Sequence, residues 1–154
     1  MISKDLGNNL TVTQILDPAN LTATANSNGV DTALTLGSAL VIVNCGESAD
    51  TLSSTVKWDY ILQDSADNSS FSAVTNSDFV THGTVDGSGI FATVDAASED
   101  DAAYSVCYVG PKRYVRVAVT KTGTHSSGTP HGVVGITSPI HKPASGGNDG
   151  SPTG

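Results

Sequence analysis

The chain has 154 residues, a formal net charge of −8 and only 14% charged residues, and its length fits a single domain with one hydrophobic core. Its 7 basic residues against 15 acidic ones argue against a nucleic-acid partner, because Lys and Arg supply most of the affinity for phosphates. No apolar run approaches the ~18 residues of a membrane-spanning helix, so a membrane is not an expected partner either.

Alternation of apolar and polar residues with period two predicts strands throughout the chain. In chain order the candidates are residues 10–16, 21–25, 39–45, 54–63, 71–74, 90–94, 103–109, 112–120 and 132–138. The clearest is 54–63, where Trp58, Tyr60 and Leu62 would share a buried face; 112–120 follows, with Val115 and Val117 on its apolar side. Short strands about 8–12 residues apart predict an all-β fold, a β-sandwich or a jelly-roll-like barrel.

Three stretches complete the expected organisation. The continuous apolar run at 40–43 predicts a strand covered on both faces. Residues 64–70 are too polar for a strand, and we expect a reversal there. We divide the chain into an extended N-terminal arm at 1–9, a sandwich domain at 10–143 and a flexible, Gly- and Ser-rich tail at 144–154.

The compartment and the cysteines give a simple expectation. The N-terminus lacks the continuous apolar stretch of a signal peptide, which favours synthesis in the cytoplasm. Cys45 and Cys107 both lie in apolar runs, and we expect two reduced core thiols. A disulfide between them stays open, since sequence alone does not determine it.

The search for catalytic, cofactor or metal sites finds none, and we expect no enzyme. The histidines are expected in loops or near the tail, as solvated side chains without zinc-ligand spacing: His82, His125, His131 and His141. Asp64, Asp67 and Asn68 lack the spacing of a calcium loop and favour a turn held by a side-chain oxygen. The acidic residues at 99–101 are adjacent, so they do not form a spaced carboxylate pair.

Four of the seven basic residues gather in one strand region: Lys112, Arg113, Arg116 and Lys121. One explanation is structural, because charges along a strand edge prevent edge-to-edge aggregation. The other is a docking strip for an acidic partner, where complementary charge helps orientation and encounter rate. The sequence leaves both open.

The chain also resembles a family of small virion proteins of tailed bacteriophages and prophages, encoded among head genes and described as capsid decoration or cement proteins. The matching pieces are Asp-Leu-x-Asn-Asn at 5–9, Thr-Ala-Thr at 22–24, Gly-Val-Asp at 29–31, the apolar 39–44 stretch, Leu-Gln-Asp-Ser at 62–65, Asp-Asn-Ser-Ser-Phe at 67–71, Tyr-Val-Gly-Pro-Lys-Arg-Tyr-Val-Arg-Val at 108–117, and two prolines at 139 and 143. The pieces around Gln63 and Lys112 are the most specific together.

The resemblance implies a non-enzymatic protein of the virion that binds the outside of the expanded head and stabilises the shell. Its partners would be the major capsid protein and further copies of itself, and a homotrimer is the oligomer that the resemblance favours. We expect contacts to the capsid from the arm, at Ile2, Ser3, Lys4 and Asp5, and from the basic strip, at Lys112, Arg113 and Arg116. The alternatives are a neck, tail or baseplate component, or a carbohydrate- or surface-binding module with exposed aromatic side chains.

Overall fold

The computed structural model describes residue 7, residues 9–33, residue 35 and residues 37–138. This part of the chain is all-β, with one short 3-10 turn, η1 (Ser77–Phe79). No helix in it is long and apolar enough to cross a membrane. The strands are β1 (Thr11–Leu21), β2 (Ala25–Asn26), β3 (Val30–Asp31), β4 (Ala39–Cys45), β5 (Lys57–Ser65), β6 (Ser72–Ala73), β7 (Val80–His82), β8 (Ile90–Val94), β9 (Ala102–Tyr108), β10 (Tyr114–Thr122) and β11 (Thr129–Thr137).

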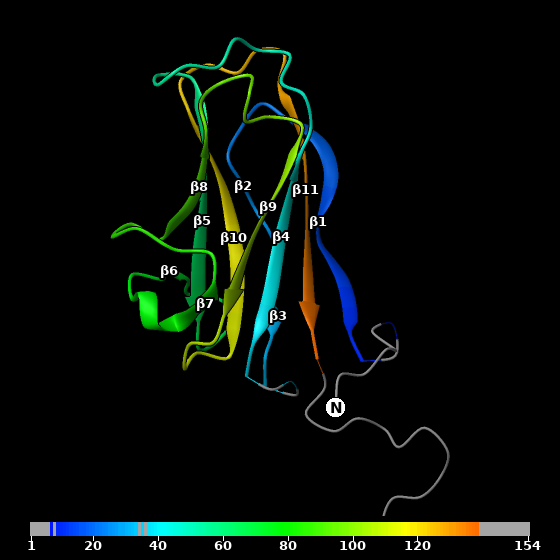
Figure 1. The fold of residues 1–154 in the computed structure, drawn as a ribbon, viewed down its shortest axis with the longest axis vertical. Coiled ribbons are helices and arrows are strands. Elements are labelled where there is room, and N and C mark those ends of the chain that lie inside the picture. The colour runs from blue at the N-terminus through cyan, green and yellow to red at the C-terminus, as the bar shows by residue number, and fades with distance from the viewer. Residues whose placement is uncertain (1–6, 8, 34, 36, 139–154) are drawn as a thin grey trace, which may run out of the picture.

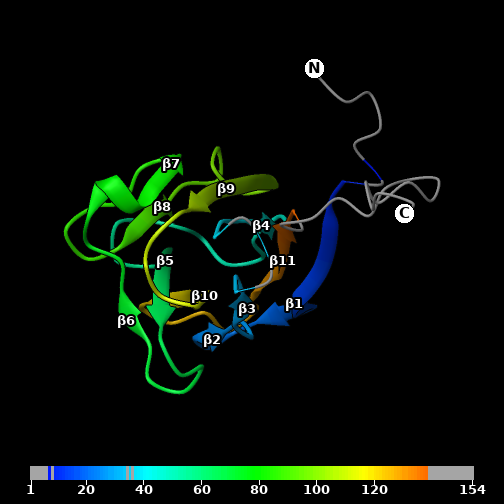
Figure 2. The same cartoon turned by 90° about the horizontal axis from the view of Figure 1, so that it is seen from below.

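The strands form two antiparallel sheets that pack face to face (Figure 1). One sheet, here called the β4 sheet, has the order β1-β11-β4-β9-β7. The other, the β5 sheet, centres on the β5–β10 pair, with β2 and β3 along the free side of β10 and β6 and β8 along β5. Figure 2 shows the two layers end on. The predicted all-β class and sandwich architecture are confirmed.

The core lies between the sheets and follows the predicted alternation. Trp58, Tyr60 and Leu62 of β5 are fully buried, and so are the alternate valines of β10. Their counterparts in the β4 sheet are also fully or almost fully buried: Val41, Val43, Val106 and Val133. The apolar area that these side chains remove from water drives the packing of the two sheets.

Several boundaries differ from the prediction. β1 continues past 16 to Leu21 through Pro18, which is tolerated because β1 is an edge strand with two register irregularities. The strand expected at 21–25 is the two-residue β2, and β3 and β7 were not predicted. Strands of two or three residues carry too few positions for any periodicity to show.

The prediction that residues 64–70 are too polar for a strand is wrong for its first two members. β5 extends through Asp64 and Ser65, which are almost completely buried. Polar side chains enter a strand when the neighbouring structure supplies hydrogen-bond partners, and Asp64 has two such partners, described below. The rest of the segment forms the expected reversal.

Both cysteines are free, and the alternation of the strands explains why. Cys45 points inward from β4, opposite Ala102 of β9. Cys107 lies opposite Leu40, at the other end of the same strand pair and on the outer face. The expectation of reduced thiols is confirmed, whereas the expectation that both lie in the core is wrong for Cys107.

The arm expected at 1–9 falls outside the described residues except for Gly7 and Asn9, and the tail expected at 144–154 falls outside them entirely. Of the domain expected at 10–143, the description reaches residue 138. The alternative of a carbohydrate-binding module needed exposed aromatic rings, and Trp58 and Tyr60 are instead fully buried.

Trp58 is the only tryptophan, so fluorescence reports on its burial directly. We expect a blue-shifted emission maximum and little quenching by acrylamide in the native protein, because no part of the indole is exposed. Guanidinium-unfolded protein is the control and should emit to the red with strong quenching. Native quenching as strong as that of the unfolded chain would contradict the buried position.

Candidate functional site

Four of the sequence pieces that carry the resemblance meet at one end of the β5 sheet: 29–31, 62–65, 67–71 and 108–117. The piece at 39–44 lies in β4 of the other sheet, and the piece at 22–24 lies beside Lys121 near the far end of β10. Asp31 lies opposite Tyr114, at the start of β10, and Tyr114 lies opposite Ser65 at the end of β5. The reversal at 66–71 and the turn at 109–113 adjoin these strand ends. Segments separated by more than 80 residues thus build one surface, here called the motif end.

The carboxylate of Asp64 is the centre of the motif end. It accepts a hydrogen bond from Tyr108 Oη at 2.8 Å, and Lys112 Nζ lies 2.8 Å from its other oxygen. Asp64 is 4% exposed, so this charge is stabilised by the two donors rather than by water. Burial, together with the Asp64 carboxylate, raises the pKa of Tyr108, which therefore stays protonated and donates.

The turn after β9 is shaped by the same tyrosine. The backbone N–H of Lys112 donates to Tyr108 Oη at 3.2 Å. A Cβ on Gly110 would collide with the Tyr108 ring, so only glycine fits this close approach. The glycine of the Gly-Pro-Lys-Arg piece is therefore explained by packing of the turn on the tyrosine.

Arg113 forms a two-pronged pair with Asp31 at the surface. Its Nε and one terminal nitrogen donate to the two carboxylate oxygens at 2.9 and 2.7 Å. The hydrogen bond from Arg113 lowers the pKa of Asp31, and the pair raises the pKa of Arg113. Both side chains stay substantially exposed, at 51% and 38%, so the pair is accessible to a partner.

Arg116 is held by a hydrogen bond and by an aromatic ring. Its Nε donates to Gln63 Oε1 at 2.8 Å, and its guanidinium lies 4.0 Å from the centre of the Phe71 ring. Gln63 faces Arg116 across the β5–β10 ladder, so strand register brings them together.

The reversal between β5 and β6 confirms the expected turn. Oδ1 of Asp67 accepts hydrogen bonds from Ser65 Oγ and from the backbone N–H groups of Ser69 and Ser70, at 2.8 to 2.9 Å. These bonds lower the pKa of Asp67. Asn68 has a positive φ of 59°. Its side chain lies so close to Gly29 that a Cβ added to Gly29 would collide with the Asn68 amide oxygen. In the described residues, no group of three or more His, Cys, Asp or Glu side chains could hold a metal ion.

The structure thus brings the predicted residues Lys112, Arg113 and Arg116 together and gives each a partner within the chain. The predicted arm residues lie outside the described residues: Ile2, Ser3, Lys4 and Asp5. Of the three cations, Arg113 is the most exposed and has the partner that is easiest to exchange, because a surface ion pair contributes little stability. Lys112 is bound to a buried carboxylate and has a structural role.

The expectation of solvated histidines is wrong for His125 and His131, which are 3% and 1% exposed. Their rings lie against Trp58, with centroid distances of 4.4 and 4.7 Å. His131 lies in β11 rather than in a loop, and an inward strand position buries its ring. His82 is likewise in a strand, β7, but is exposed, and His141 lies outside the described residues.

Hydrogen bonds fix His131 in one neutral form. Its Nδ1 lies 3.0 Å from the carbonyl oxygen of Thr129, which only accepts, so Nδ1 carries the proton. Nε2 therefore accepts from Tyr60 Oη at 3.0 Å, and Trp58 Nε1 donates to Thr129 Oγ1 at 3.0 Å. Burial lowers the pKa of His131 to about 4. This cluster joins β5 to β11 across the core.

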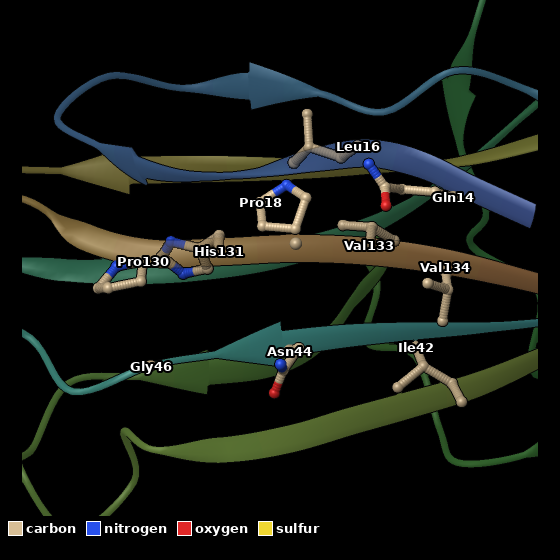
Figure 3. A pocket seen from close by; sticks show the side chains of 11 residues that line it. Gln14, Leu16, Pro18, Ile42, Asn44, Gly46, Pro130, His131, Val133 and Val134 are labelled. Atoms are coloured by element: carbon tan, nitrogen blue, oxygen red, sulfur yellow. The ribbon is translucent and has the colours of Figure 1, made fainter.

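A second surface lies on the outer face of the β4 sheet, and the sequence did not predict it. Leu40 and Ile42 were expected to be covered on both sides, but they are half-buried on a face that no layer of the described residues covers. A depression of about 200 Å³ runs along this face beside β1, lined by Gln14, Leu16, Pro18, Ile42, Asn44, Gly46, Pro130, His131, Gly132, Val133 and Val134 (Figure 3). The only sequence signal for this face was the apolar run at 40–43, which is typical both of a strand covered on two sides and of a strand with one uncovered apolar face.

No family model matches the chain, and no curated protein matches it. The surfaces are therefore interpreted from their own chemistry and from the motif pieces that they contain.

Replacing Asp64 and Asp31 by alanine separates the buried interaction from the exposed one. Asp64→Ala leaves Tyr108 Oη buried without its acceptor, and we expect a loss of about 2 kcal/mol in the free energy of unfolding. Asp31→Ala removes an exposed pair and should cost less than about 1 kcal/mol. Urea denaturation measures both. Equal losses would contradict the central position of Asp64.

The neutral, buried His131 predicts acid sensitivity. Its pKa is about 4 in the folded protein against 6.5 ordinarily, so the unfolded chain binds more protons between these values. Stability is therefore complete above pH 6.5 and falls toward pH 4, by about 3 kcal/mol from this group. His131→Gln should flatten the dependence of the unfolding free energy on pH. An unchanged slope in this variant would refute the assignment.

Proposed function

We propose that this protein is a non-enzymatic structural component of a tailed-bacteriophage virion, which decorates the outer surface of the expanded head and stabilises the shell. The observation that carries the proposal is the convergence of four motif pieces, the two most specific among them, at the motif end. Gly29 lies against Asn68 and Phe71, and Arg116 joins Phe71 to Gln63. Lys112 pairs with Asp64, and Arg113 pairs with Asp31. These four pieces are thus neighbours in space as well as short matches in the sequence, which supports the proposal.

The polar groups of the motif end support a binding role rather than a catalytic one. Asp64 and Asp67 accept hydrogen bonds from partners in or beside the turns, and Arg116 donates to Gln63 across the β5–β10 ladder. Arg113 and its partner Asp31 remain exposed on the rim of this rigid surface. A capsid carboxylate that replaces Asp31 as the partner of Arg113 gives orientation at low cost, since the surface pair contributes little stability.

Stabilisation of the shell follows from mass action. A protein that binds the assembled lattice but not its dissociated subunits stabilises each site by RT ln(1 + [L]/Kd), and the effect adds over the repeated sites of a head. Decoration therefore requires no chemistry, only a rigid domain at sufficient concentration. The net charge of −8 favours solubility at that concentration.

Copy number and head binding test the proposal. We expect quantitative mass spectrometry of purified particles to give one copy, or a simple fraction of a copy, per major capsid subunit. A handful of copies per particle would move the protein to the neck or tail, and absence from particles would refute a virion role.

Binding to expanded heads tests the contact residues. Arg113→Gln should weaken binding roughly fivefold, about 1 kcal/mol, because it removes a charge from the motif end. Lys57→Gln, the same charge change at the opposite end of β5, is the matched control and should bind normally. Deletion of residues 2–9 should also weaken binding without unfolding the domain. Equal binding by Arg113→Gln and the unsubstituted protein would exclude Arg113 from the contact.

A further inference from the structure

The centre of the outer face of the β4 sheet carries no charged side chain, and Asp17 and His82 lie at its two edges. On β1, Asp17 accepts a hydrogen bond from Gln14 Nε2 at 2.6 Å, and on β7, His82 Nε2 lies 2.9 Å from Ser105 Oγ. Strand register places its side chains in rows across the sheet: Val12, Ile136, Leu40 and Cys107 in one row, and Gln14, Val134, Ile42 and Ser105 in the next. Beyond them Gly132, Asn44 and Ala103 form a third row, with Pro18 against Gly132. Strands β4, β9 and β11 contain no Asp, Glu, Lys or Arg at any position.

The apolar side chains of this face are accessible. Val12 is 64% exposed, and Leu40, Ile42, Val134 and Ile136 are half-buried because they cover one another. Isolated exposed apolar residues are ordinary, but a contiguous apolar patch on a water-facing sheet marks an interaction surface.

The opposite outer face, on the β5 sheet, has different chemistry. Its rows contain Lys57 with Asp59, and Arg116 with Gln63, held in pairs at 3.1 and 2.8 Å. Two copies of a chain with net charge −8 repel each other over most of their surfaces. The centre of the β4 sheet's outer face, over β4, β9 and β11, would let two copies meet with Asp17 left at the rim of the contact.

The geometry of the face also suits a sheet-on-sheet contact. The ladders β11–β4 and β4–β9 run without a register break, whereas the irregularities are confined to the outer strands β1 and β7. Regular sheet faces pack on one another at about 10 Å, with interdigitating side chains. The depression beside β1 provides a recess for side chains of the opposing copy (Figure 3).

We propose that the outer face of the β4 sheet binds a second copy of this chain. Contact of a face with the same face of another copy is isologous and closes as a two-fold dimer. The trimer that the resemblance implies would need two different surfaces in contact. The inference rests on the face alone and does not depend on head binding.

Analytical ultracentrifugation without heads tests the proposal at micromolar to about 100 μM protein. The expected mass is twice the 15.6 kDa of one chain. Val134→Lys puts a charge in the centre of the face and should give the single-chain mass. Thr120→Lys, the same charge on the outer face of the β5 sheet, is the matched control and should keep the double mass. Near-ultraviolet circular dichroism verifies that both variants are folded.

A single-chain or triple-chain mass for the unsubstituted protein would overturn the proposal, as would a double mass for folded Val134→Lys. Head binding by the same variants keeps the two proposals apart. If the unsubstituted protein is a monomer and Val134→Lys loses head binding, the face is a capsid contact and not a dimer contact. If Val134→Lys is a monomer that still binds heads, dimerisation holds and is separate from decoration.

Discussion

The antiparallel pairing of β5 with β10 is the constraint on which the rest of the structure depends. It runs without a break from Lys57 opposite Thr122 to Ser65 opposite Tyr114. Because side chains alternate across a ladder, this one register directs Trp58 and its inward neighbours into the core and sets Gln63 beside Arg116 outside it. A shift of one residue would exchange the two faces and dismantle the core and the motif end together.

The strands with clear alternation were predictable from the sequence because half-buried strands alternate their side chains. The valines of β10 and the aromatic residues of β5 lie where period two places them. The partners of polar residues were not predictable in this way. Asp64 and His131 appear solvated by composition, yet both are buried, because donors and acceptors 44 and 71 residues away in the chain meet them in space.

For the candidate surfaces, too, the residues involved were partly predictable from the sequence, whereas their tertiary partners were not. The motif pieces indicated that the basic strip matters, but its salt bridges to Asp31 and Asp64 depend on tertiary contacts that spacing does not reveal. The outer face of β4 was missed for another reason. A run such as Leu40 to Val43 is equally typical of a strand between two layers and of a strand with one uncovered apolar face, and only the topology distinguishes the two.

The pairing of β1 with β11 sets Thr11 opposite Thr137, so the described sandwich starts and finishes at neighbouring points on one sheet edge. A short peptide joining these points, with a new opening in the exposed turn at 86–88, gives a circular permutant that keeps every strand pair. The same geometry suits the domain to insertion as a module into a loop of another protein. It also means that force applied at these two points would peel β1 from β11 one hydrogen bond at a time, instead of shearing the whole ladder at once.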